Sequence, residues 1–229
     1  MTEPIKVDIW SDIVCPWCYI GKRKFEAGSA AFAAAGEERA VVVEYHSYEL
    51  SPDTPVDFEG SAVDYLVARK GVAPAQVGQM LERVTSIAAS VGLEYDYDAL
   101  QHTNTIKAHQ LLHYAKSKGK QLEMKERLFK ALFTEGRHVG RVPDLADLAA
   151  EIGLDRAEVV RVLEADEFLS EVRADQSLAM EYGIQGVPFF VIDGRYGVSG
   201  AQEPVAFAQV LEQVWAERDV QVELEEASA

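Results

Sequence analysis

The two cysteines of this 229-residue chain, Cys15 and Cys18, lie two residues apart in the segment VCPWCY. Such a pair can cycle between dithiol and disulfide, supply half of a zinc site, or be two buried thiols. Structural zinc normally has four protein ligands, and the sequence holds no second CxxC. Histidines would have to complete a metal site, and His109 and His113 are one helical turn apart. Their flanks are typical of an amphipathic helix, so we expect no metal and favour redox chemistry.

The composition is that of a globular protein with a large acidic excess. Hydrophobic residues make up 48% of the chain, and the formal net charge is −16 at pH 7. This charge opposes binding to nucleic acid and to anionic membrane surfaces. The sequence shows neither a membrane-spanning run nor a secretory leader, so we expect a cytoplasmic protein. Structural disulfides are rare in the reducing cytosol, which favours a catalytic role for the cysteine pair.

Hydrophobic patterns predict the elements that position the pair. Residues 5–10 form a short, mostly apolar run that predicts a strand, and a helical pattern begins at Cys15 and ends near Gly36. Residues 40–50 are rich in β-branched and aromatic side chains and predict a second strand. The dithiol therefore lies at the first strand-to-helix turn of a β-α-β unit with parallel strands.

The middle of the chain is predicted to be helical. Between residues 56 and 183 seven helical segments follow one another, each closed by a glycine or by a loop. The glycines expected at helix C-termini are Gly71, Gly92, Gly119, Gly136, Gly153 and Gly183. Strand character returns in 186–200, where the DG pair predicts a hairpin, and a last helix begins at Pro204.

These motifs together resemble the DsbA family of thioredoxin-fold oxidoreductases. A CPWC pair follows the first strand, a distant GVP precedes the hairpin, and a helical insertion separates them. The segments WSDIVCPWCYIG, NTIKAHQLLHYA, LFTEGRHVG and GIQGVPFFVIDGRYGVSGAQ are similar to the FrnE-like branch of that family. The resemblance implies an α/β, thioredoxin-like fold with a large all-helical insertion between its βαβ and ββα halves. The discontinuous thioredoxin-like domain would comprise 1–55 and 184–218, the helical insertion 56–183, and an acidic flexible tail 219–229.

The position of the dithiol suggests a role for each thiol. Cys15 would begin a helix, where free backbone N–H groups and the helix dipole stabilise an anion, so we expect a lowered pKa and an exposed attacking nucleophile. Cys18 would lie one turn deeper and release the mixed disulfide. Pro16 suits the first helical turn. Trp17 brings no charge, unlike the histidine of strongly oxidising relatives, which predicts a less oxidising pair.

The resemblance places the substrate beside this pair. In thioredoxin-fold proteins the proline before the hairpin is cis, and the residue preceding it offers its backbone to the substrate chain. Val187 and Pro188 take these positions here, and Pro16 and Trp17 are further candidates for substrate contact. The alternative is that Pro188 merely begins an edge strand.

Asp8, Asn104, Thr105 and His109 are further candidates for the site, whereas Asp12 is not. Asp8 lies in an apolar strand, where an unpaired carboxylate is costly, so it either accepts a proton beneath the dithiol or points outward. Asp12 reads as a turn or cap residue. Asn104, Thr105 and His109 are candidates for lining the cleft. Asn104 equally fits a helix cap, and His109 equally fits a core histidine.

The leading hypothesis is a cytosolic thiol–disulfide oxidoreductase or isomerase acting on protein disulfides or small thiols. It would need no cofactor beyond the Cys15–Cys18 disulfide, with glutathione as a candidate reductant, and it would be a monomer or a homodimer. One alternative is a glutathione-dependent 2-hydroxychromene-2-carboxylate isomerase or kappa-class transferase, although such relatives carry a serine where Cys15 stands. The other alternative is a redox-gated protein-binding module.

Overall fold

The elements follow the predicted order. The structure, a computed structural model, describes residues 3–36 and 39–226, with side chains as far as Arg218. The strands are β1 (Ile5–Ser11), β2 (Val41–Ser47), β3 (Phe189–Ile192) and β4 (Tyr196–Ser199). The helices are α1 (Pro16–Ala33), α2 (Ala62–Lys70), α3 (Pro74–Ser90), α4 (Ile106–Ser117), α5 (Gln121–Phe133), α6 (Val142–Glu151), α7 (Arg156–Glu164), α8 (Leu169–Glu181) and α9 (Pro204–Glu226).

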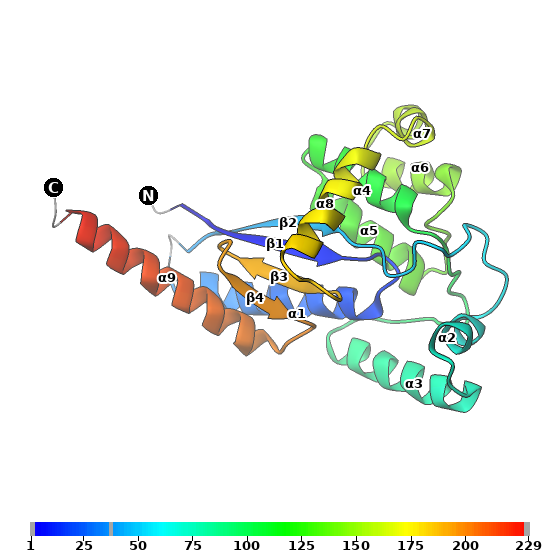
Figure 1. Cartoon of the computed structure of the whole chain (residues 1–229), viewed down its shortest axis with the longest axis horizontal. Coiled ribbons are helices and arrows are strands. Elements are labelled where there is room, and N and C mark those ends of the chain that lie inside the picture. The colour runs from blue at the N-terminus through cyan, green and yellow to red at the C-terminus, as the bar shows by residue number, and fades with distance from the viewer. Residues whose placement is uncertain (1–2, 37–38, 227–229) are drawn as a thin grey trace.

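A four-stranded mixed sheet lies at the centre of the molecule (Figure 1). Its order is β2-β1-β3-β4, with β1 parallel to β2 and antiparallel to β3, and with β3 antiparallel to β4. The βαβ and ββα halves therefore join along β1 although the whole helical insertion separates them in sequence. The predicted α/β, thioredoxin-like class is confirmed.

Strand alternation assigns β1 side chains to two faces of the sheet. Ile5, Val7 and Ile9 belong to a core shared with α1 and α9, which cover one face (Figure 1). Trp10 points to the other face, where it packs with the end of α8 around Ala179. One face of the sheet is therefore covered by α1, the helix that begins at the dithiol, and the opposite face is not.

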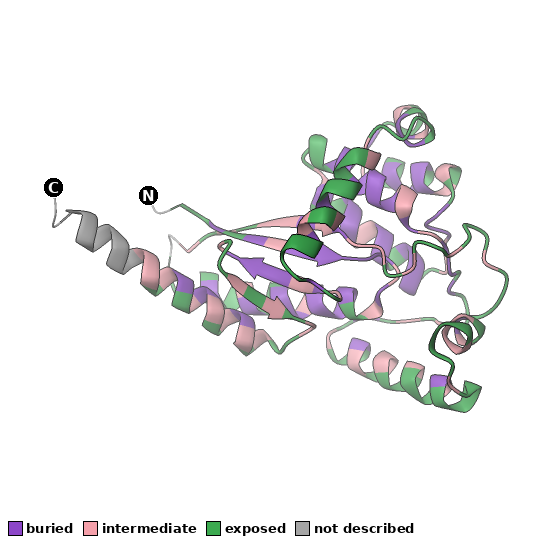
Figure 2. Ribbon diagram, viewed as in Figure 1, coloured by how far each residue is buried: buried purple, intermediate pink, exposed green. Residues whose placement is uncertain are grey.

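The helices α3 to α7 build a second core against the first turn of α1. This core contains both cysteines together with buried side chains of α4, α5, α6 and α7. Figure 2 shows buried residues both in the strands and in these helices. All six glycines predicted to end helices have positive φ, the conformation that glycine adopts most readily. The dithiol thus lies where the sheet and the insertion meet.

Two predicted element ends differ from the structure. Helix α1 ends at Ala33, with Ala34 as its C-cap, before Gly36 is reached. Helix α9 continues to Glu226, so most of the segment predicted as a flexible tail, 219–229, is helical, and 227–229 lie outside the described residues. The domain limits remain a prediction. Within the described part of the chain, no helix has the length and apolar character needed to cross a membrane.

A buried dithiol as the candidate active site

The turn after β1 delivers the dithiol to the start of α1. Cys15 has an extended backbone as the N-cap, and Pro16 is the first helical residue. The backbone N–H of Cys15 donates to the carbonyl of Asp12 at 3.3 Å, and that of Cys18 donates to the carbonyl of Cys15 at 3.0 Å. The chain therefore changes from strand to helix at the first cysteine, as predicted.

Both cysteines are free thiols, and both are buried. Cys15 is 4% exposed and Cys18 is 2% exposed, so the expectation of an exposed Cys15 is wrong. The insertion covers the dithiol, since Tyr95 from the loop after α3 donates its hydroxyl to the carbonyl of Pro16 at 2.8 Å. Trp17, in contrast, is 38% exposed. Trp17 therefore marks the exposed side of the dithiol turn.

The Val187–Pro188 peptide is cis and lies against Cys15, as predicted. The Cys15 Sγ donates to the carbonyl oxygen of Val187 at 3.6 Å. Close packing requires a glycine in α1, because a Cβ at Gly21 would lie 2.9 Å from Cγ of Pro188. The structure thus brings together two segments that are more than 170 residues apart. Substrate contact by Val187 and Pro188 stays a prediction.

A cavity of about 340 Å³ opens beside Cys15. Cys15, Pro16 and Trp17 form one side of it, and α2, α3 and the loop before α4 form the others. Most of this lining is apolar. His102 stacks on Tyr65 with 3.9 Å between ring centroids, and burial lowers the pKa of His102 to about 4, so its ring is neutral at pH 7.

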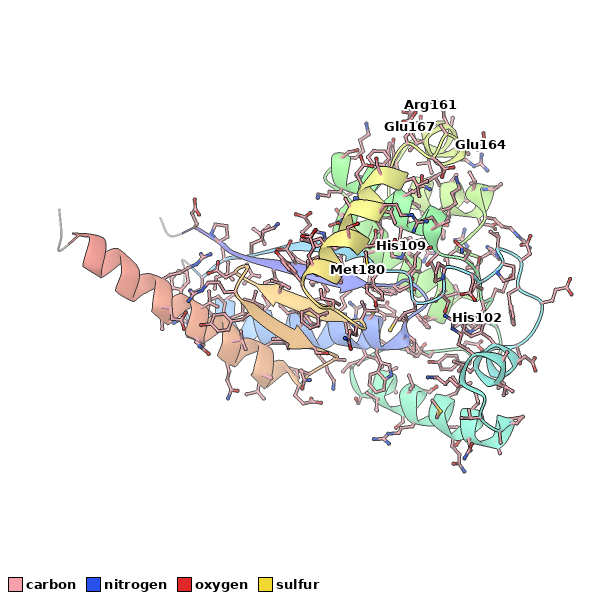
Figure 3. All side chains as sticks on the ribbon, in the orientation of Figure 1. His102, His109, Arg161, Glu164, Glu167 and Met180 are labelled. Atoms are coloured by element: carbon pink, nitrogen blue, oxygen red, sulfur yellow. The ribbon has the colours of Figure 1, made fainter. Side chains whose placement is uncertain are left out.

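Asn104, Thr105 and His109, predicted to line the cleft, are not among the residues that line this cavity. Asn104 accepts from the N–H of Ile106 at 2.9 Å and donates to the carbonyl of Pro52 at 2.9 Å, so it joins the start of α4, whose N-cap is Thr105, to a loop. His109 is fully buried in α4. Figure 3 shows His102 in the loop before α4 and His109 further along, within that helix.

Asp8 does not lie beneath the dithiol. Its neighbours in β1 place it on the sheet face opposite α1, where its carboxylate is 2.8 Å from Nε2 of His46 and 2.9 Å from Nζ of Lys6. Burial opposes ionisation, but His46 and Lys6 hold the pKa of Asp8 below its ordinary value. Of the two predicted placements of Asp8, the one beneath the dithiol is therefore wrong, because strand alternation directs its side chain away from the helix that carries the cysteines.

Asp12 is the buried acid beside the dithiol, a role that the sequence interpretation as a turn residue missed. Its carboxylate is fully buried, lies 3.3 Å from Nε2 of His109 and accepts from the N–H of Leu50 at 2.8 Å. Burial opposes ionisation, but these contacts and Thr105 hold the pKa of Asp12 below its ordinary value. His109 and Thr105 thus act on the site through Asp12.

The two thiols differ in acidity, in the opposite sense to the prediction. The pKa of Cys15 is well above its ordinary value, first because of its hydrogen bond with Cys18 and then because of burial. The pKa of Cys18 is lowered although burial opposes this, because Cys15 and the charge of Lys125 favour the anion. The hydrogen bond with Cys18 and burial therefore outweigh the effect of the helix N-terminus on Cys15.

One group of potential metal ligands occurs among the described residues, and it excludes the cysteines. It consists of Asp8, Glu44 and His46, whose ligand atoms lie within 4.8 Å of one another. Lys6 and Lys116 form ion pairs with these carboxylates. The carboxylates therefore already have cationic partners within the chain.

Comparison with known proteins accounts for the arrangement of dithiol, cis-proline and inserted helices. Residues 6–212 match the family described as DSBA-like thioredoxin domain. The chain belongs to this DSBA-like family. The resemblance to DsbA proteins seen in the sequence is thereby confirmed. A relative, "Uncharacterized protein YwbO" of Bacillus subtilis strain 168, is 30% identical over 215 residues, which cover 92% of this chain and 96% of YwbO.

Solved structures of DSBA-like proteins superpose over most of the chain. The "probable DsbA oxidoreductase SCO1869" from Streptomyces coelicolor is 39% identical, with a TM-score of 0.85 over 93% of this chain and 91% of that chain. The cytosolic disulfide reductase DsbM from Pseudomonas aeruginosa, solved with GSH, is 18% identical, with a TM-score of 0.63 over 92% of this chain and 99% of that chain. The likeness to DsbM is one of fold.

Proposed function

We propose that this protein is a thiol–disulfide oxidoreductase that exchanges disulfides of protein substrates through Cys15 and Cys18. The observation that carries the proposal is the contact of 3.6 Å between Cys15 Sγ and the carbonyl of Val187, beside a cis Pro188. This contact puts a reactive sulfur next to a backbone segment that can pair with a substrate chain. Membership of the DSBA-like family supports the same chemistry.

Access decides which thiol attacks. Cys15 lines the cavity and Cys18 does not, so a substrate disulfide entering there meets Cys15 first. Attack by Cys15 forms a mixed disulfide, and attack by Cys18 on Cys15 then releases the substrate thiol. The reaction needs no group beyond the two cysteines and a low-molecular-weight thiol, such as glutathione, that reduces the enzyme again.

The cavity supports a substrate with an apolar side chain next to its disulfide. Its walls from α3 include Met80, Leu81 and Val84. Tyr97 also lines the cavity, and its buried hydroxyl has no hydrogen-bond partner among the described residues. We place this reaction in the cytosol, and thiol trapping after cell fractionation would test that location.

Reduction of insulin disulfides, followed by turbidity, tests the function. We expect Cys15→Ser to abolish the activity, because no thiol then lines the cavity. Cys18→Ser is the matched variant: it can still attack but cannot release the product, so it should accumulate a mixed disulfide visible by mass spectrometry. Unchanged insulin reduction by Cys15→Ser would contradict the redox mechanism.

The same variants distinguish the two alternatives. A glutathione-dependent isomerase would convert 2-hydroxychromene-2-carboxylate and tolerate Cys18→Ser. A binding module would suppress aggregation of unfolded proteins after both cysteines are replaced. Our proposal predicts neither result.

A further inference from the structure

The cavity beside Cys15 has apolar walls and no acidic side chain. Helix α3 contributes Met80, Leu81 and Val84, and Phe133 at the end of α5 adds an aromatic ring. Although the sequence holds 38 acidic residues, none of the described ones lines this cavity. Its volume of about 340 Å³ falls in the range of small-molecule sites, about 300 to 1,000 Å³. The cavity is therefore suited to a small molecule with an apolar body.

Two cationic side chains from the last turn of α2 also line the cavity. Arg69 already has partners, since its guanidinium donates to Asp53 at 3.0 Å and to the carbonyl of Leu50 at 3.0 Å. Lys70 is exposed, and its ammonium forms no ion pair within the described part of the chain. Lys70 is thus free to pair with an anionic group at the outer end of the cavity.

The other polar side chains of the lining carry no charge. The hydroxyl of Tyr97 is buried and has no hydrogen-bond partner among the described residues. His102 is 9% exposed and is held by stacking on Tyr65. Burial lowers the pKa of His102 to about 4, so its ring is neutral at pH 7. Among the described lining residues, Lys70 is therefore the one charged side chain without an ion pair.

The lining of the cavity excludes the cis-proline loop. Neither Val187 nor Pro188 is part of it, although Cys15 Sγ lies 3.6 Å from the carbonyl oxygen of Val187. A molecule held in the cavity can therefore reach Cys15 without pairing with that loop. The oxidising and reducing half-reactions of a dithiol occur in turn, so a small reductant can enter after the protein substrate has left. The cavity is thus available to a second molecule in each catalytic cycle.

We propose that the cavity also binds the reductant, and that it selects an aliphatic thiol that carries a carboxylate. The thiol reaches Cys15, the hydrocarbon chain lies along the apolar walls, and the carboxylate pairs with Lys70. Dihydrolipoate, a dithiol on an eight-carbon acid, has these parts and serves as the probe. Glutathione is a polar peptide thiol, and apolar walls would leave its amide groups without partners. This inference rests on the proposed disulfide exchange.

Electrons and protons balance with such a dithiol acid. One sulfur of the reductant, as a thiolate, attacks Sγ of Cys15 and breaks the Cys15–Cys18 bond, which leaves Cys18 as a thiolate. The second sulfur then attacks the first, forms the cyclic disulfide lipoate and displaces Cys15 as a thiolate. Two electrons pass to the enzyme, and the two cysteine thiolates take up the two protons that the reductant has lost.

Octanoate has the same chain length and no sulfur, so titration calorimetry with octanoate measures the site without redox chemistry. We expect saturable binding that is about tenfold weaker for hexanoate, because two methylene groups are lost. Met80→Asp should weaken octanoate binding by about tenfold or more, because it places a like charge beside the ligand. Met180→Asp is the matched control, since Met180 is 73% exposed on α8 and lies away from His102 (Figure 3). Absence of saturable binding, or equal binding of hexanoate, would overturn the inference.

The contact with Lys70 has a test of its own. Lys70→Gln should weaken octanoate binding by about threefold, as expected for an exposed ion pair, and should leave octanamide binding unchanged. Arg83→Gln removes a cation from α3 outside the cavity lining and is the control. Equal losses for octanoate and octanamide would overturn the assignment of the carboxylate.

Reduction of the oxidised protein, followed by thiol trapping and mass spectrometry, connects the site to the reaction. The rate should saturate with dihydrolipoate, fall when octanoate competes, and rise linearly with dithiothreitol and with glutathione. Lys70→Gln should raise the half-saturating concentration of dihydrolipoate by about threefold without changing the maximal rate. Saturation with glutathione but not with dihydrolipoate would refute the choice of reductant.

Insulin reduction driven by dithiothreitol separates this inference from the proposed function. If insulin is reduced but the rate of enzyme reduction rises linearly with every thiol, the reductant site is refuted and the proposed function stands. If octanoate binds but the wild-type protein exchanges no disulfide, the proposed function fails together with the reductant, and only a site for aliphatic acids remains.

Discussion

At the scale of single residues, Asp12 and not Asp8 is the acid beside the dithiol. Asp8 lies on the face opposite α1, bound to His46 and Lys6, whereas Asp12 is fully buried beside the dithiol. The negative charge of Asp12 is one of the factors that raise the pKa of Cys15. The acid that influences Cys15, Asp12, therefore lies in the turn after β1 and not within that strand.

Asp12→Asn should make Cys15 more acidic. In a Cys18→Ala background, the pH profile of iodoacetamide alkylation should move to lower pH, because the substitution removes a nearby negative charge. Unfolding in urea should also show a loss of about 1 to 3 kcal/mol from the broken buried hydrogen bonds. Asp8→Asn is the matched control. An equal shift of the alkylation profile in both variants would show that Asp12 has no particular effect on the acidity of Cys15.

The sequence held a signal for Lys125 but none for Asp12. Lys125 falls in the apolar stripe of its helix, with Met124, Leu128 and Phe129, where a lysine is unusual. The placement of Asp12 depends on how the insertion folds back over the turn, with His109 nearly a hundred residues away. Local patterns carry no information about such a contact.

At the scale of elements, the packing of α1 against the cis-proline loop is the critical contact. Helix and strand positions followed from periodicity and from glycine at helix ends, because these depend on local sequence. The tight approach of Pro188 to Gly21 depends on three-dimensional packing and was not predicted. The family resemblance implied only that Val187 and Pro188 lie beside Cys15.

Gly21→Ala should push the loop away from Cys15. A Cβ there would lie 2.9 Å from Pro188, so we expect a loss of about 1 to 3 kcal/mol in unfolding free energy and a marked loss of insulin reduction. Gly78→Ala in α3 is the control, since a Cβ at Gly78 meets no described atom within 4 Å. It should stabilise the protein by about 0.5 to 1 kcal/mol with unchanged activity. Full activity in Gly21→Ala would show that loop position is unimportant.

At the scale of the whole molecule, His46 joins the sheet to the insertion. Its Nε2 lies 2.8 Å from Asp8 in β1, and its Nδ1 lies 2.6 Å from Asp175 in α8. Trp10 stacks on its ring with 4.5 Å between centroids. Burial lowers the pKa of His46, but Asp175 and Asp8 outweigh it and raise the pKa to about 9. Protonated His46 therefore bridges two acids from different parts of the fold.

This bridge predicts a pH dependence of stability. The pKa of His46 is higher in the folded than in the unfolded chain, so its contribution is complete below about pH 6.5 and is lost as the pH rises through about 9. The contribution is about 3 kcal/mol. Urea unfolding at pH 6, 7.5 and 9 should show this decline in the wild type and a much flatter profile in His46→Gln. Parallel profiles would contradict the role of His46.

The strand order also has a consequence for synthesis on the ribosome. β1 needs β3 as its second neighbour, yet Phe189 follows the end of β2 by more than a hundred residues. At translation rates of about 5 to 20 residues per second, one edge of β1 stays open for about 10 s or longer. During that interval both cysteines have left the ribosome, but the Val187–Pro188 loop that later packs against Cys15 has not. The nascent chain therefore exposes a pairable strand and a reactive dithiol together, which makes it a target for chaperones and for oxidation before it becomes an enzyme.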